Sequence, residues 1–227
     1  TCLKTEIISI ISETNGIAIK DTLELLCYDP AIKKDKEKLL LVKDFLSLLN
    51  RFQSDQVNIE RLLEHPVSNV FYDFFKLFPL KFHEEHIHLT GSLSPSFIFP
   101  RLKALLEGPN AEDYEKKIIE VYGEEALPIN TVEDINNLVS LKEEENFTDY
   151  LRILYLAKLI LKSKADYEEA AYHLATELYT KFNIGSIRLK FSLSRITTDS
   201  SEQIPGIESL SEKDVVLGLY EGFSKFK

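Results

Sequence analysis

Two short segments with the pattern of β-strands stand about 100 residues apart in this chain, and helical patterns fill the interval. The second segment, Ile187 to Leu193, alternates strictly between apolar and polar residues, which is typical of a strand with one buried face. The first, residues 81–92, carries three of the five histidines and ends at Gly91 and Ser92. Strands joined through helices pair in parallel, so the pattern predicts an α/β fold.

The first segment also predicts a pair of metal ligands. In an extended backbone successive side chains point to opposite faces, so Glu84, His86 and His88 are expected on one face. The other face is expected to hold His83, Glu85, Ile87 and Leu89. Two imidazoles on a rigid strand can share one zinc ion, with nitrogens at about 2.0–2.1 Å. A bare His-x-His pair is also, and more often, a pair of ordinary, partly exposed histidines.

Composition narrows the class of protein. The 227 residues are enough for one large domain or two small ones, and the net charge of −10 argues against a nucleic-acid partner. Two cysteines, Cys2 and Cys27, provide neither a disulfide framework nor a four-cysteine zinc site. The first residues do not resemble a signal peptide and no apolar run is long enough to cross a bilayer, so we expect a cytoplasmic protein without a membrane partner.

Residues 1–78 read as a helical extension without a catalytic cluster. Helical periodicity is found in segments 22–27, 39–49, 59–64 and 70–78, after an isoleucine-rich stretch at residues 7–11. The aromatic residues of the last segment are interpreted as packing, and His65 and His173 as packed or surface histidines.

Helices are predicted after the first strand at residues 94–106, 111–122, 131–141, 147–161 and 166–182, and after the second strand at 211–226. Ser94 is predicted to cap the first of these, which explains this serine without a nucleophilic role, and Pro100 is predicted to kink or break the same helix. Asp166 is predicted as a cap. Because two parallel strands alone do not make a stable domain, we expect further strands beyond residue 227.

The segment from Pro79 to Leu93 resembles the first strand and helix of the adenosine deaminase family. Family members open their barrel with Pro-Lys-x-Glu-Leu-His-x-His-Leu-x-Gly-Ser-Leu. Their second strand reads Val-x-Tyr-x-Glu-x-Arg-[Tyr/Phe]-Ser-Pro, and Phe191 and Ser192 stand in the matching place here. The resemblance covers residues 79–227 and implies the first part of a (β/α)8 barrel of the TIM type.

The resemblance also implies a function and a site. His86 and His88 would be two ligands of one zinc ion, and Thr90 and Gly91 would contact a small nucleoside substrate. The remaining ligands, a third histidine and an aspartate, and the catalytic glutamate and histidine are expected beyond residue 227. The implied reaction is zinc-dependent hydrolytic deamination of a purine nucleoside, adenosine to inosine and ammonia, by a metal-activated water.

Departures from the family pattern keep alternatives open. Thr90 stands where compact members carry an aspartate, Arg188 and Lys190 replace a glutamate and an arginine, and Leu193 replaces a proline. One alternative is another metal-dependent amidohydrolase, acting on a different aminated ring or on an amide. Another is a scaffold protein of the same fold that has lost catalysis. Glu84, Glu85 or a residue on another strand could orient the ligand histidines, and the oligomeric state stays open.

Overall fold

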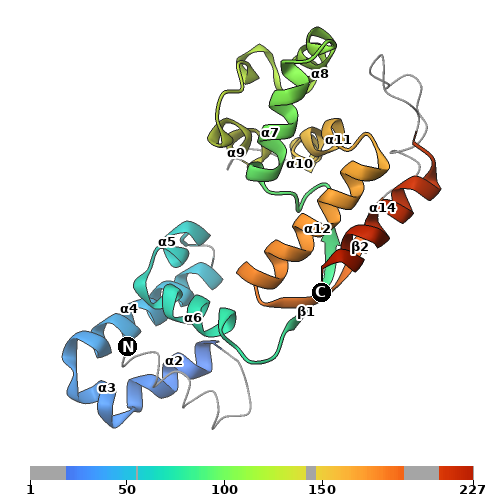
Figure 1. The fold of residues 1–227 in the computed structure, drawn as a ribbon. Helices are drawn as coiled ribbons and strands as arrows, with labels where there is room; N and C mark the ends of the chain where they lie inside the picture. The colour runs from blue at the N-terminus through green and yellow to red at the C-terminus, as the bar shows by residue number, and fades with distance from the viewer. Residues whose placement is uncertain (1–18, 55, 142–146, 192–209, 227) are drawn as a thin grey trace. The chain divides into compact units, whose positions relative to one another are not determined.

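The computed structural model describes residues 19–54, 56–141, 147–191 and 210–226 (Figure 1). Its contacts divide the chain into two compact units, Thr1–Leu80 and Lys81–Lys227. In its described part the first unit consists of helices, while the second combines helices with a sheet of two parallel strands.

The prediction of an eight-stranded (β/α)8 barrel is wrong for this chain. The structure is 69% helical, and its described residues form a single sheet of two strands. The physical reason is that strand-type patterns occur in only two segments, whereas the other described elements follow helical periodicity. A motif in one strand does not determine how many strands follow it.

The first unit packs short helices around an aromatic core. Its elements are α2 (Ile19–Tyr28), α3 (Pro30–Lys34), α4 (Lys36–Gln53), α5 (Ile59–Leu63) and α6 (Pro66–Lys76). Their buried faces form one cluster: Leu23, Leu26, Ile32, Val42, Phe45, Val67, Phe71 and Phe74. Tyr72 of α6 is half exposed, whereas Phe71 and Phe74 are buried, and the ring of Phe71 stacks on Phe45 with centroids 6.3 Å apart. Packing is therefore confirmed as the role of Phe71 and Phe74. Each such ring stabilises the fold by about 1.5–3 kcal/mol through burial.

Asp29 separates two helices where the sequence indicates only the end of one. Its carboxylate accepts hydrogen bonds from the N–H groups of Ala31 at 2.8 Å and Ile32 at 3.1 Å. Pro30 occupies the first helical position, where its missing N–H costs nothing. The Asp-Pro pair therefore ends α2 and also starts α3.

The second unit starts with β1 (Phe82–His88) and continues into a helical layer. This layer comprises α7 (Pro95–Leu106), α8 (Ala111–Tyr122), the 3-10 turn η1 (Glu124–Ala126), α9 (Val132–Val139), α10 (Phe147–Arg152), α11 (Tyr155–Ile160) and α12 (Lys164–Lys181). The chain then forms β2 (Ile184–Lys190) and, further on, α14 (Glu212–Lys225). The predicted parallel pairing with helical connections is thus confirmed.

Three local predictions for this layer need correction. Pro100 lies inside α7 without ending it. The segment predicted as one helix, 147–161, is two helices separated by a turn, and the freed carbonyl of Arg152 accepts a hydrogen bond from the Tyr122 hydroxyl at 2.7 Å. The cap of α12 is Ser163, and Asp166 is its capping-box partner three residues later.

Helices α12 and α14 pack side by side (Figure 1). Two glycines one turn apart in α14 face α12. A Cβ at Gly218 would lie 2.5 Å from the carbonyl oxygen of Lys164, and one at Gly222 would lie 2.2 Å from that of Glu168. No side chain fits at these distances, so the glycines set the spacing of the two helices.

The apolar side of the sheet rests on the core of this layer. Ile87 of β1 and three residues of β2 pack there while partly buried: Ile184, Ile187 and Leu189. The core itself is drawn from α7, α8, α9, α11, α12 and α14, with fully buried residues such as Leu102, Ile118 and Leu156. One side of the two strands is therefore fixed by packing.

Candidate metal-binding site on β1

A β-bulge in β1 changes the predicted division of its side chains. Glu84 pairs with Ile187 and Ile87 pairs with Leu189, so three steps along β1 match two steps along β2. Paired residues share a side of the sheet, which places Glu84 with Ile87 on the side of the core. His88 pairs with Lys190 on the opposite side. The prediction that Glu84, His86 and His88 share a face is wrong for Glu84. The prediction that His83 and Glu85 lie on the other face with Ile87 is wrong too, because a single extra residue reverses the alternation.

The exposed residues opposite the core form what we call the polar face. It comprises His83, Glu85, His86 and His88 of β1 with Ser186, Arg188 and Lys190 of β2. At one end of this face the two ligand candidates converge: the Nε2 atoms of His86 and His88 are 3.0 Å apart, and their rings are tilted by 36°. Two nitrogens bound to one tetrahedral zinc ion lie about 3.3 Å apart, so the pair has the spacing of two zinc ligands.

The pair supplies only part of a zinc site. Within the described residues, no group of three or more His, Cys, Asp and Glu side chains is placed to hold a metal ion. A structural or catalytic zinc site takes three or four protein ligands. The polar face therefore provides two histidine ligands for zinc, and one or two further protein ligands would be needed to complete the site.

Neither glutamate orients the imidazoles of the pair in the part of the chain described. The Glu84 carboxylate accepts a hydrogen bond from the backbone N–H of His86 at 3.1 Å. The Glu85 carboxylate lies 3.0 Å from His83 Nε2 and 3.2 Å from an Arg188 nitrogen. Glu84 thus holds the bulged backbone, whereas Glu85 belongs to a separate network.

That network occupies the other end of the polar face. The hydroxyl of Ser186 is 2.6 Å from His83 Nδ1, while Glu85 lies at the Nε2 atom of the same ring. The carboxylate favours a proton on Nε2, which leaves Nδ1 to accept from the serine. The side chains of His83, Glu85 and Arg188 are 44%, 64% and 65% exposed, so water competes for each contact. Five steps along the strand, at about 3.3 Å each, separate His83 from His88.

The predicted substrate-contacting residues follow β1 directly. Thr90 is half-buried and Gly91 is exposed, and both lie in the turn that leaves the strand. The Ser92 hydroxyl donates a hydrogen bond to the His88 carbonyl at 2.6 Å, which ties the turn to the strand end. A Cβ on Gly91 would meet a methyl group of Leu154 at 3.1 Å. The structure thus brings Thr90 and Gly91 to the end of the strand that carries the histidine pair.

Another histidine, His173, lies between α7 and α12 with polar side chains around it. His173 Nε2 is 2.9 Å from the Ser94 hydroxyl and 3.2 Å from a Glu177 carboxylate oxygen. Burial lowers the pKa of His173, although Glu177 opposes that shift. Ser94 is the N-cap residue of α7 as predicted, but its hydroxyl makes no capping hydrogen bond and contacts His173 instead.

This cluster is not a catalytic triad. A triad uses both ring nitrogens of its histidine, one for the serine and one for the acid. Here Ser94 and Glu177 approach the same nitrogen of His173. The adjoining cavity of about 340 Å³ holds Arg101, whose guanidinium stacks on Phe97 and is engaged by Glu169. These contacts join α7 to α12, and His173 is a packed histidine as predicted.

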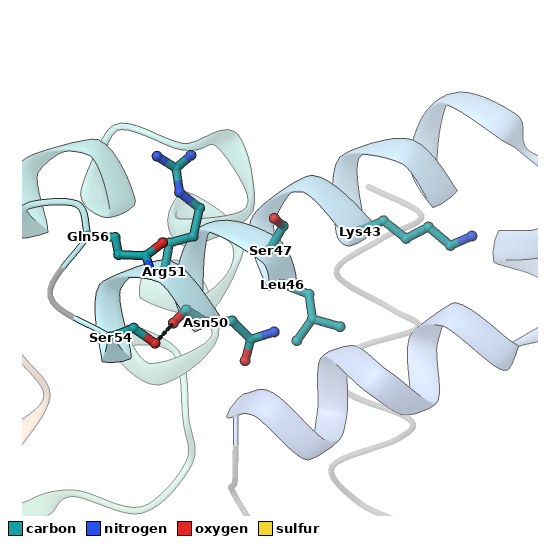
Figure 2. A pocket seen from close by; sticks show the side chains of 7 residues that line it. All are labelled: Lys43, Leu46, Ser47, Asn50, Arg51, Ser54 and Gln56. Atoms are coloured by element: carbon teal, nitrogen blue, oxygen red, sulfur yellow. Dashed lines mark hydrogen bonds between the residues drawn. The ribbon is translucent and has the colours of Figure 1, made fainter.

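The first unit has a cavity of about 460 Å³ along α4. Figure 2 shows its seven lining side chains, with Lys43 and Arg51 extending in different directions and Ser54 donating to the Asn50 carbonyl at 3.0 Å. Its polar groups do not converge on a common point. This cavity offers no arrangement comparable to the histidine pair.

Comparison with known proteins adds no relative. No family model matches the chain, and searches of curated proteins and of solved structures found no match. The resemblance to adenosine deaminases accordingly rests on the motif around His86 and His88 and on the second strand. None of the helices described has the length and apolar character that crossing a bilayer requires.

Proposed function

We propose that this protein is a zinc-dependent hydrolase that deaminates a purine nucleoside, adenosine to inosine and ammonia. The observation that supports it is the convergence of His86 and His88, whose Nε2 atoms lie 3.0 Å apart at the exposed end of β1. The same residues carry the sequence resemblance. In this proposal Thr90 and Gly91 contact the substrate, and the protein works in the cytoplasm.

The residues at the end of β1 have separate tasks in this proposed reaction. His86 and His88 would hold the ion through neutral imidazoles. A zinc ion held there would supply a water that ionises near neutral pH. Pairing of His88 with Lys190 and the hydrogen bond from Ser92 to the His88 carbonyl fix the backbone at His88. The third ligand and the acid that protonates the ring nitrogen of the substrate lie outside the described residues in this proposal.

A second candidate is a metal-dependent amidohydrolase acting on another aminated ring or on an amide. The observation that favours it is Thr90, which stands beside the histidine pair where compact nucleoside deaminases carry an aspartate. A hydroxyl does not replace a carboxylate as an acceptor for sugar hydroxyls with the same strength. A substrate panel separates the two candidates.

The experiment uses the intact natural protein, loaded with zinc and mixed with adenosine, with ammonia release as the readout. We expect release that a chelator abolishes. The variant His88→Ala should lose zinc affinity by about 100-fold or more and turnover with it, because a ligand contributes at least as much as the residues that orient it. His83→Ala removes an exposed imidazole from the same strand and should keep both. Full zinc content and full activity in His88→Ala would contradict the proposal.

A further inference from the structure

Ser186 and His83 lie opposite each other at the end of the polar face away from the histidine pair. His83 pairs with Ser186, whereas the residue before it in β1 pairs with Ile184, so one step along β1 matches two steps along β2. The extra residue of this second bulge is Gly185, where a Cβ would lie 2.5 Å from the Cβ of Lys81. The glycine therefore allows the bulge that brings the serine onto the polar face opposite His83.

Three side chains at this end are joined by polar contacts. The Ser186 hydroxyl is 2.6 Å from Nδ1 of His83, and the Glu85 carboxylate is 3.0 Å from Nε2 of the same ring. A Ser-His-acid triad has this order, with a nucleophile at one ring nitrogen and a carboxylate at the other. The two nitrogens are exchanged relative to the serine proteases, but each still has a single task. These contacts thus meet the geometric requirement that the side chains around His173 do not meet.

A cavity next to the serine indicates which groups fit beside it. The cavity measures about 210 Å³ and is lined by Ser186 together with apolar side chains of α12, β2 and α14, among them Leu178 and Phe223. An apolar cavity of about 150 Å³ is large enough to bind benzene. A short acyl chain or a phenyl group is therefore of the right size for this cavity. The serine itself is exposed, so a substrate can reach it.

We infer that Ser186 is the nucleophile of a second, metal-independent activity of this protein, the hydrolysis of esters with a short acyl group. The Ser186 oxygen attacks the ester carbonyl and forms a C–O bond, while the hydroxyl proton passes to Nδ1 of His83. The ester C–O bond then breaks, and His83 gives the proton to the departing alcohol. Water hydrolyses the acyl-serine in the same way, and its proton returns through His83 to the Ser186 oxygen.

Two further residues support this chemistry. Glu85 is a positioning residue, because its carboxylate holds the imidazole and stabilises the positive charge that forms on it. Arg188 follows Ser186 by two residues on the same face and lies 3.2 Å from Glu85. Its guanidinium carries five N–H donors, which suits it to stabilise the negative carbonyl oxygen of the tetrahedral intermediate.

The test measures ester hydrolysis by the intact protein in the presence of a chelator. The substrates are 4-nitrophenyl butyrate and 4-nitrophenyl decanoate, and we expect kcat/KM to be about 10-fold or more higher for the butyrate, because a ten-carbon chain exceeds the cavity. Ser186→Ala and His83→Gln should each lower kcat for the butyrate by about 100-fold or more. Ser224→Ala, the same change at an exposed serine of α14, is the matched control and should leave kcat unchanged.

Glu85 is tested by separating kcat from KM. Glu85→Gln should lower kcat by about 10-fold or more and leave KM unchanged, because the residue acts through the imidazole and does not touch the substrate. Glu85→Asp keeps the carboxylate and should recover part of the loss. An unchanged kcat in Glu85→Gln would overturn the positioning role.

A fluorophosphonate probe identifies the nucleophile directly. The serine oxygen bonds to the phosphorus of the probe and fluoride leaves, so mass spectrometry should find the adduct on the peptide that contains Ser186, and far less of it in His83→Gln. Labelling of another residue, hydrolysis that the chelator abolishes, or full activity in Ser186→Ala would overturn the inference. Equal turnover of the two esters would overturn the substrate class. The deaminase proposal stands or falls separately, because it depends on zinc and on the other end of the polar face.

Discussion

The helical layer and the polar face of the second unit use histidine in opposite ways. On the helical layer, His173 is 25% exposed and its ring is held by Ser94, Glu177 and the ring of Phe97, whose centroid lies 4.6 Å away. On the polar face, His86 and His88 are exposed, and their rings contact each other. The first arrangement satisfies the imidazole within the fold, and the second pairs two exposed imidazoles with each other where a ligand can reach them.

The difference shows where stability and ligand binding reside in this unit. A buried polar group needs partners, and removing them costs free energy of folding. Exposed polar groups with few contacts contribute little to stability and can therefore be arranged for a ligand. Substitutions in the helical layer should lower stability, whereas substitutions on the polar face should leave stability unchanged and alter binding.

The largest effect is expected at Gly222. The variant Gly222→Ala places a methyl group 2.2 Å from the Glu168 carbonyl oxygen, so α12 and α14 must move apart. We expect a loss of about 1–3 kcal/mol in the free energy of unfolding, measured by denaturant titration. Val216→Ala is the control, because Val216 is an exposed residue of the same helix. An unchanged midpoint for Gly222→Ala would show that the two helices are not packed as described.

A smaller, pH-dependent effect is expected at His173. Burial lowers the pKa of this histidine below its usual value of about 6.5, so the unfolded chain takes up the proton first as the pH falls. This group therefore costs no stability above about pH 7 and reduces stability progressively as the pH falls through 6.5. His173→Gln should lose about 1 kcal/mol at pH 7 with its hydrogen bonds and show a weaker decline between pH 7 and 5.

Ser94→Ala is the companion variant for that prediction. It removes the 2.9 Å contact to the imidazole but keeps the titrating group. We expect it to lower stability at pH 7 while retaining the decline toward pH 5. Equal pH profiles for wild type and His173→Gln would show that His173 is not the group responsible.

The sequence predicts the elements of this unit better than the relation between them. The alternation around Ile187 and the His-x-His segment correctly predict two parallel strands. The helix predicted from residue 131 is confirmed at its start by α9, whose N-cap is Thr131. The bulge in β1 has no signal in the sequence, because it depends on how β1 aligns with β2. Likewise the contact between Ser94 and His173 joins residues 79 positions apart, and local capping rules do not foresee it.

In the candidate site, too, local features could be predicted from the sequence and long-range contacts could not. Converging nitrogens on His86 and His88 follow from their separation of two residues on a strand, which local reasoning predicts. The position of Lys190 beside His88 follows only from the strand register, which pairs the two Cα atoms. Long-range pairing is therefore what sequence analysis lacks here, and it decides which charges surround the histidine pair.

The smallest effect on stability, and the clearest on binding, is expected on the polar face. His86→Ala should change the free energy of unfolding in metal-free buffer by no more than about 0.5 kcal/mol, since the side chain is exposed. Zinc that binds the folded protein alone should stabilise wild type by about 2.7 kcal/mol at a concentration 100 times its dissociation constant. His86→Ala should lose this increment and His83→Ala should keep it, as measured by thermal unfolding with and without zinc. A zinc-dependent shift that survives in His86→Ala would place the metal away from the histidine pair and remove the contrast between the two regions.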